Sequence, residues 1–227
     1  MAESSIYTSI VFLLTTIITL WFLFKASKNI KMIAGITIWM IITGILGISG
    51  FYRNVEAFPP RFVFLIGPAI LFVLAVFLLR DGRRFVDGLD LKWLTLLHMV
   101  RVPVEFVLFA IFLDGLIPEL MTFEGYNYDI ISGITAPIIY YVFFVKGWIG
   151  KKGLLLWNIV CLLLLLNILT IALLSAQTPF QKLAFDQPNI GVAYFPFVWL
   201  PAVIVPIVLF SHLASIRQLL LPVPEKM

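Results

Sequence analysis

The sequence predicts an all-helical membrane protein, a bundle of seven transmembrane helices with its N-terminus outside and its C-terminus in the cytoplasm. Three observations predict this fold: hydrophobic residues make up 62% of the chain, charged residues make up only 12%, and the mean hydropathy is +1.07. A soluble domain has about a quarter of its residues charged, so most of this surface is expected to face lipid. We therefore expect the 227 residues to form a single transmembrane domain.

Seven apolar segments are long enough to cross a bilayer, which requires about 20 residues in a helix. The expected helices are 6–24, 32–51, 62–79, 93–113, 130–146, 154–174 and 192–215. Small residues on the second helix (Gly44, Gly47 and Gly50) predict close packing against a neighbour. Three prolines in the seventh helix (Pro196, Pro201 and Pro206) predict that it is bent.

The basic residues predict the orientation, because they concentrate in alternate loops. Twelve of them, in the 25–31, 80–92 and 146–152 loops and the C-terminal tail, are Lys25, Lys28, Lys31, Arg80, Arg83, Arg84, Lys92, Lys146, Lys151, Lys152, Arg217 and Lys226. Only Arg53, Arg61 and Lys182 lie on the other side. Cytoplasmic loops carry an excess of lysine and arginine, which explains the pI of 9.2 without a nucleic-acid partner.

The start of the chain and its single cysteine argue against a cleaved signal peptide, a disulfide and a cysteine-rich metal site. Residues 1–5 are acidic rather than basic, so they lack the n-region of a cleaved signal peptide, and we expect the first helix to remain. The single cysteine, Cys161, lies in an apolar run, which excludes an intrachain disulfide and a cysteine-rich metal site.

The fourth predicted helix carries the most informative residues. His98, Arg101 and Glu105 are spaced three and four apart, so they form one polar stripe on a helix. A charged group at this depth costs about 3 kcal/mol or more unless it is paired or hydrated. The stripe is therefore either an internal Arg101–Glu105 pair that holds the helix to its neighbours or a site for a ligand, ion or substrate. Pro103 between them frees a backbone carbonyl one turn earlier, as an acceptor or a hinge.

A second polar group is expected in the inner half of the bundle. His212 and Asn158, on two other helices, fall at about the depth of His98, with Arg101 and Ser211 near the same level. Two histidines at matching depth predict either hydrogen-bonded interior residues or the axial ligands of a haem b. No further ligand is evident at that depth, so no other metal site is predicted.

The predicted outer loops contain charged and amide side chains that could close over the outer mouth of the bundle, with Glu105 pointing towards them. The candidates are Arg53, Arg61, Glu119, Glu124, Asn127 and Asp129. The alternative is that these residues are ordinary solvated loop residues.

Four runs of the sequence carry a resemblance: 98–105, 122–129, 185–189 and 196–218. Together they resemble an uncharacterised family of bacterial seven-helix integral membrane proteins. The resemblance implies a bacterial cytoplasmic (inner) membrane location, but it does not indicate which activity the protein has. Pro103-Val-Glu105 is also similar to the Pro-x-Glu-Glu motif of the small membrane lycopene cyclases, although Phe106 stands where that motif has its second carboxylate.

The leading hypothesis is binding or transport of a small solute, ion or lipid in a polar cavity around the fourth helix. Glu105 and Arg101 would form its charged core, and His98 and His212 its cytoplasmic gate or proton-linked groups. One alternative is a membrane-embedded enzyme that acts on a lipid or isoprenoid, with Glu105 as acid or base. The others are a bis-histidine haem b protein and a non-catalytic subunit of a membrane complex. A homo-oligomer is compatible with each.

Overall fold

The computed structural model describes residues 4–55 and 57–222, so Lys226, one of the residues in the charge argument, lies outside the described part. Within these ranges the secondary-structure elements are all helices or helical turns and none is a strand, which confirms the all-helical prediction. The helices are α1 (Ile6–Ser27), α2 (Ile30–Ile48), α3 (Val63–Leu78), α4 (Arg80–Asp87), α5 (Leu91–Leu97), α6 (Arg101–Leu113), α7 (Ile130–Tyr140), α8 (Lys151–Ser175) and α9 (Val205–Leu220). The shorter elements are 3-10 turns at Phe51–Arg53, His98–Val100, Glu119–Met121 and Gly191–Ala193, and π-helical turns at Tyr141–Val145 and Leu200–Ile204.

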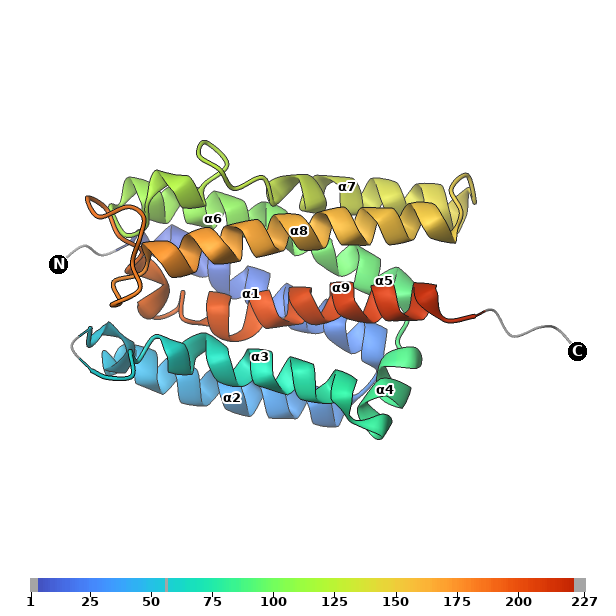
Figure 1. Ribbon diagram of the computed structural model, residues 1–227, viewed down its shortest axis with the longest axis horizontal. Coiled ribbons are helices and arrows are strands. Elements are labelled where there is room, and N and C mark those ends of the chain that lie inside the picture. The colour runs from blue at the N-terminus through green and yellow to red at the C-terminus, as the bar shows by residue number, and fades with distance from the viewer. Residues whose placement is uncertain (1–3, 56, 223–227) are drawn as a thin grey trace, which may run out of the picture.

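The helices run back and forth along the long axis of the molecule (Figure 1). Five of those described are long and apolar enough to cross a membrane: Ile6–Ser27, Ile30–Ile48, Leu91–Leu113, Lys151–Ser175 and Leu200–Leu220. A sixth is α3 if α4, bent from it by 88°, belongs to the same span. The remaining predicted span is the shorter apolar helix Ile130–Val145.

The first turn between helices is tighter than predicted. Lys28 adopts a left-handed conformation, and its backbone N–H donates to the carbonyl of Phe24. The side chain of Asn29 then accepts a hydrogen bond from the N–H of Met32 at 3.1 Å, and asparagine is a favoured residue at this position. As a result α1 continues to Ser27, and α2 begins at Ile30.

The basic segment 80–92, expected as a loop, contains α4 and the start of α5. Gly82 permits the sharp turn, because a Cβ atom there would collide with the carbonyl oxygen of Val76. Arg83 donates to the carbonyl of Leu78 at 2.8 Å and so satisfies a free end of α3. Arg217 on α9 fixes α4 in place through two hydrogen bonds to Asp87, at 2.7 and 2.8 Å.

The fourth predicted span is one passage, Leu91–Leu113, with a 3-10 turn at His98–Val100. Pro103 explains the turn, because it has no N–H to donate to the carbonyl of Met99. The N–H of Arg101 instead reaches the carbonyl of His98, and this tighter winding is the 3-10 pattern.

The last helix begins later than predicted, at the π-turn Leu200–Ile204 rather than at Val192, and continues to Leu220. Pro206 has no N–H, so it leaves the carbonyl of Ala202 free. The indole of Trp39 on α2 donates to that carbonyl at 3.0 Å, and Trp199 donates in return to the carbonyl of Met40 at 2.9 Å. The glycines of α2 permit this contact, since a Cβ on Gly47 would lie 2.9 Å from Val198.

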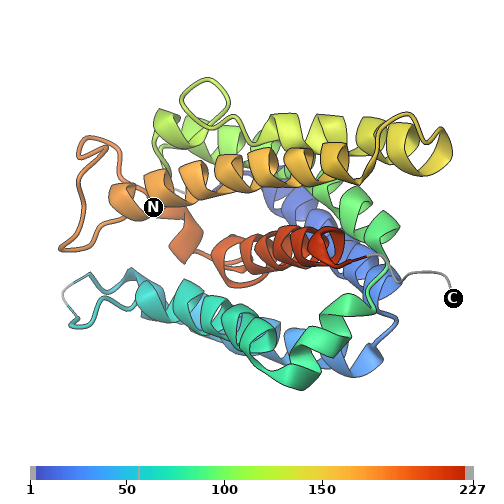
Figure 2. The same ribbon diagram turned by 45° about the vertical axis from the view of Figure 1, so that its right-hand side comes forward.

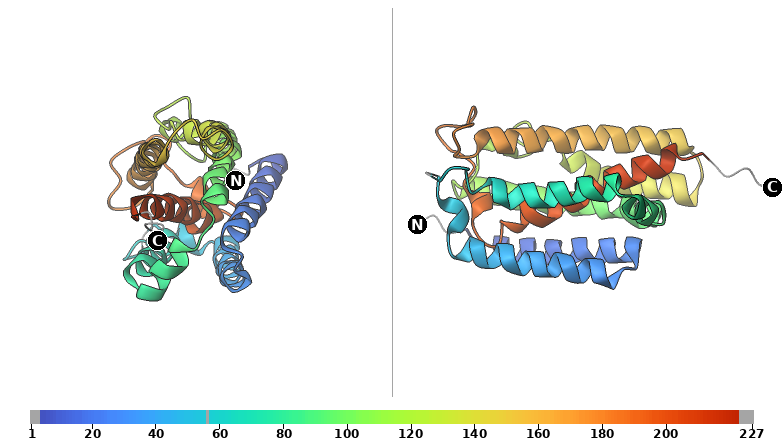
Figure 3. Two further views of the ribbon diagram at one scale, coloured as in Figure 1. Left: turned by 90° about the vertical axis from the view of Figure 1, so that its right-hand side faces the viewer. Right: turned by 60° about the horizontal axis from the view of Figure 1, so that its bottom comes forward.

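Helix α9 occupies the centre of the bundle, between the α7–α8 pair and the α2–α3 pair (Figures 2 and 3). Of its spanning stretch 61% is buried, against 22% for α2. The side chains that face α9 therefore define the interior of the protein.

Candidate functional site

The polar stripe of the fourth span lies inside the bundle. His98, Arg101 and Glu105 are 0%, 2% and 1% exposed, whereas Met99 and Phe106, which follow His98 and Glu105 in the sequence, are exposed. This placement is what the cost of a lipid-facing charge requires.

The chain segment between α6 and α7 re-enters the bundle and meets this stripe. The carboxylate of Asp129, the residue before α7, lies 3.1 Å from the guanidinium of Arg101. Because Arg101 is near the middle of the span Leu91–Leu113, α7 begins halfway along the bundle. Gly133 permits the close approach, since a Cβ there would lie 2.9 Å from the backbone nitrogen of Val102.

Glu105 is bound by the same re-entrant segment. The amide nitrogen of Asn127 lies 2.7 Å from each carboxylate oxygen of Glu105 and 3.0 Å from the carbonyl of Met121. The amide oxygen of Asn127 accepts a hydrogen bond from the N–H of Asp129 at 3.1 Å. Arg101 and Glu105, for which the sequence left a mutual ion pair open, are each bound instead by the segment before α7, Arg101 by Asp129 and Glu105 by Asn127. The spacing of residues on one helix could not reveal these partners.

The charges of this cluster do not balance. Arg101 and Asp129 neutralise each other, while Glu105 has a neutral amide as its partner. A buried charge without an opposite charge is costly, so Glu105 is the group in this cluster that would bind a proton or a cation.

The other half of the site, nearer the start of α5, consists of aromatic and amide groups. The rings of His98 and His212 stack face to face, with centroids 3.8 Å apart and an angle of 14° between them. The amide nitrogen of Asn158 donates to the carbonyl of Leu154, so its oxygen faces Nδ1 of His212, at 3.0 Å. Nδ1 must therefore carry a proton, and Nε2 is left with a free lone pair. The rings of Trp157 and His98 pack edge to face, with centroids 5.6 Å apart.

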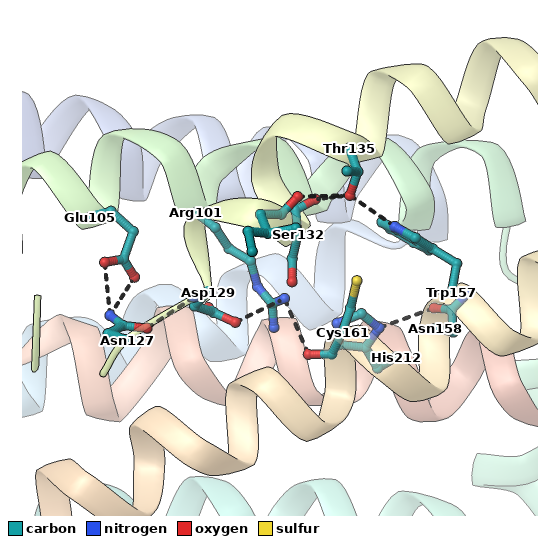
Figure 4. Close-up of polar contacts among 11 residues, drawn as sticks. Arg101, Glu105, Asn127, Asp129, Ser132, Thr135, Trp157, Asn158, Cys161 and His212 are labelled. Atoms are coloured by element: carbon teal, nitrogen blue, oxygen red, sulfur yellow. Dashed lines mark hydrogen bonds and ion pairs between the residues drawn. The ribbon is translucent and has the colours of Figure 1, made fainter. Parts of the chain in front are cut away.

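The two halves form one row along the bundle (Figure 4). Arg101 joins them, because it also donates to the carbonyl of Cys161 on α8 at 3.4 Å. Several buried polar atoms in the described part of the row have no hydrogen-bond partner: Nε and Nη2 of Arg101, both ring nitrogens of His98, Nε2 of His212 and Oγ of Ser132. Since buried polar groups normally find partners, the row can bind water or a small ion.

The histidine geometry does not fit a haem. Axial histidines approach the iron through a ring nitrogen from opposite faces of the macrocycle, whereas His98 and His212 stack directly against each other. No group of three or more His, Cys, Asp or Glu side chains that could hold a metal ion occurs within residues 4–55 and 57–222.

The predicted outer-mouth residues do not stay together. Asn127 and Asp129 are buried in the row, whereas Glu119 and Glu124 are exposed. Arg53 lies over the ring of Tyr194 at 5.0 Å, and Arg61 over that of Phe51 at 4.5 Å. Ser211, expected in the inner layer, donates to the carbonyl of Ile207 in its own helix.

The depth that Asn127 and Asp129 reach is not predicted from the sequence, and neither is the presence of Ser132 and Trp157 in the site. One feature of the sequence does indicate that depth. The apolar segment that follows Asp129 is only 16 residues long as a helix (Ile130–Val145), so the residues before it must lie below the membrane surface if it is to reach the other side.

Comparison with known proteins gives a family but no function. No curated protein and no solved structure matches the chain. The family described as a domain of unknown function (DUF8737) matches residues 59–220, which contain α3 to α9 and the whole polar row. Because this match covers well over half of the chain, the protein belongs to that family.

Proposed function

We propose that the protein is a seven-span transport protein of the cytoplasmic membrane of a bacterium, which moves a small solute or ion with protons as the coupling species. The observation that carries the proposal is the surplus buried carboxyl group of Glu105, held by an amide at one end of a row of ionisable and polar groups. Rows of Asp, Glu and His side chains inside a membrane are typical of proton pathways in pumps and transporters.

The topology supports seven spans. Helix α1 begins at one end of the bundle and α9 ends at the other (Figure 1), which requires an odd number of crossings. In this proposal α3 with α4 forms one crossing, and α7 completes another together with the re-entrant segment 114–129. Helices that begin at mid-membrane beside a polar site are a common feature of transporters. The excess of basic residues assigns the α4 end to the cytoplasm.

Each group in the row has a role in this proposal. Glu105 takes up a proton on the outer side of Arg101, and the free Nε2 of His212 accepts one on the inner side. The fixed positive charge of Arg101 lies between them and opposes the passage of a proton. Opening of the Arg101–Asp129 pair is therefore the event that would couple proton movement to the movement of a solute.

Liposomes that contain the purified protein and a pH-sensitive dye test the proposal. Occasional opening of the Arg101–Asp129 pair should also let protons pass in the absence of solute, so under an imposed voltage we expect faster proton entry than in empty liposomes, and loss of this excess in Glu105→Gln. Glu119→Gln is the matched control, because Glu119 is exposed in an outer loop, and it should conduct like the wild type. Proton entry equal to that of empty liposomes, or unchanged in Glu105→Gln, would overturn the proposal.

A further inference from the structure

A second site lies on the other side of α9 from the polar row. A cavity of about 690 Å³ opens between α2, α3, α4 and α9, and its walls include Ile36, Trp39, Val73, Phe85 and Phe210. Cavities of about 300–1,000 Å³ with mostly apolar walls are typical of ligand sites. None of the residues of the polar row lines it, so it is a separate site.

Specific contacts at two levels fix the positions of the helices that form the cavity walls. At the middle of the bundle, the hydrogen bond from Trp39 to the carbonyl of Ala202 fixes α2 against the turn before α9. At the other end α4 turns by 88° from α3, contributes Gly82 and Phe85 to the cavity wall, and is bound to α9 by the Arg217–Asp87 pair. Gly35 lines the cavity, and a Cβ added there would meet no atom within 4 Å.

The polar groups of the cavity are confined to one end. Asn29 and Lys31 line it there, and Lys31 is exposed. The same end of the molecule carries the exposed side chains of Lys28, Arg80 and Arg84, and this is the end where cytoplasmic loops are expected. An apolar chamber at membrane depth with cations at its interfacial end is complementary to a molecule with a long apolar tail and an anionic head.

We propose that this cavity binds an acyl chain of an anionic phospholipid from the cytoplasmic leaflet, with its phosphate beside Lys31. The tail lies between α2 and α3 against Trp39 and Phe210. The bound lipid completes the contact between the α2–α3 pair and α9, and the site exists whether or not the polar row carries protons.

Native mass spectrometry of the full-length protein tests the site, with the protein freed of lipid and titrated with phosphatidylglycerol or phosphatidylcholine. We expect tight binding of one phosphatidylglycerol and at least tenfold weaker binding of phosphatidylcholine. Gly35→Phe, which adds a large side chain to the lining of the cavity, should weaken phosphatidylglycerol binding at least tenfold. Gly67→Phe is the matched control, since Gly67 does not line the cavity and a Cβ there makes only an ordinary contact at 3.7 Å. Lys31→Gln should abolish the preference between the two lipids.

A second measurement needs no cavity-filling variant. Phosphatidylglycerol brominated along its acyl chain should quench part of the tryptophan fluorescence of the wild type, and Trp39→Phe should lack the quenched component. Equal binding of the two lipids by the wild type would overturn the proposal. So would wild-type affinity in Gly35→Phe, or quenching unchanged by Trp39→Phe.

Discussion

The two sides of α9 differ in what they bury. On one side, α6, α7 and α8 enclose Arg101, Glu105 and Asp129, and α7 comes so close that only glycine fits at position 133. On the other side, α2 and α3 leave a cavity with apolar walls. The difference has a physical reason. A buried charge needs a partner within hydrogen-bond distance, which requires close backbones, whereas apolar side chains next to lipid tolerate a gap that lipid can fill.

The largest effect that distinguishes the two sides is expected at the ion pair. Asp129→Ala leaves the Arg101 charge buried and unpaired, and we expect the free energy of unfolding to fall by about 3–5 kcal/mol. The measurement is unfolding of the purified protein in mixed micelles with increasing denaturing detergent. Glu124→Ala, in the same loop but exposed, should change the free energy by less than about 0.5 kcal/mol.

The double variant Arg101→Met/Asp129→Leu removes both charges and checks the cause. It should be more stable than Asp129→Ala, because replacing a whole buried pair with apolar residues is often neutral or stabilising. If Asp129→Ala were as stable as the wild type, the pair would contribute nothing to the fold, and the contrast between the two sides would fail.

The next largest effect concerns backbone distance. Gly133→Val places two methyl groups against Val102, where a Cβ alone would lie 2.7 Å from its Cγ2 atom. We expect a loss of about 1–3 kcal/mol, typical of overpacking. Gly35→Val, on the cavity side, has no neighbouring atom within 4 Å of its Cβ, so it should leave the midpoint of thermal unfolding unchanged. Equal destabilisation by the two variants would mean that the sides do not differ in packing.

The parts of this contrast that the sequence predicts are those that depend on residues close together in the chain. The apolar segments predict the helices to within a few residues at most ends, and the spacing of His98, Arg101 and Glu105 places them on one buried face. The depth of His212 and Asn158 also follows from counting along their helices. These inferences need only helical periodicity and the cost of burying charge.

The rest depends on contacts between distant segments. The pairing of Asp129 with Arg101 requires that the loop before α7 enter the bundle. The hydropathy of the sequence does not show whether a loop does this. The helix α4 is not predicted, because a run of basic residues is equally typical of a cytoplasmic loop. The cavity depends on the angle between α3 and α4 and on the hydrogen bonds of Trp39 and Trp199. Of these features the sequence indicates only the prolines, which leave a backbone carbonyl free to accept a hydrogen bond.

The smallest expected effect lies on the cavity side, at the tie between α2 and α9. Trp39→Phe keeps an aromatic ring but leaves the carbonyl of Ala202 without its indole donor. Hydrogen bonds between membrane helices contribute about 0.6 kcal/mol on average, so the same detergent-unfolding measurement should show a loss of this size. Trp199→Phe, which removes the reciprocal bond to Met40, should have a similar effect. A loss as large as that of Asp129→Ala would mean that the apolar side depends on its polar contacts as strongly as the charged side does.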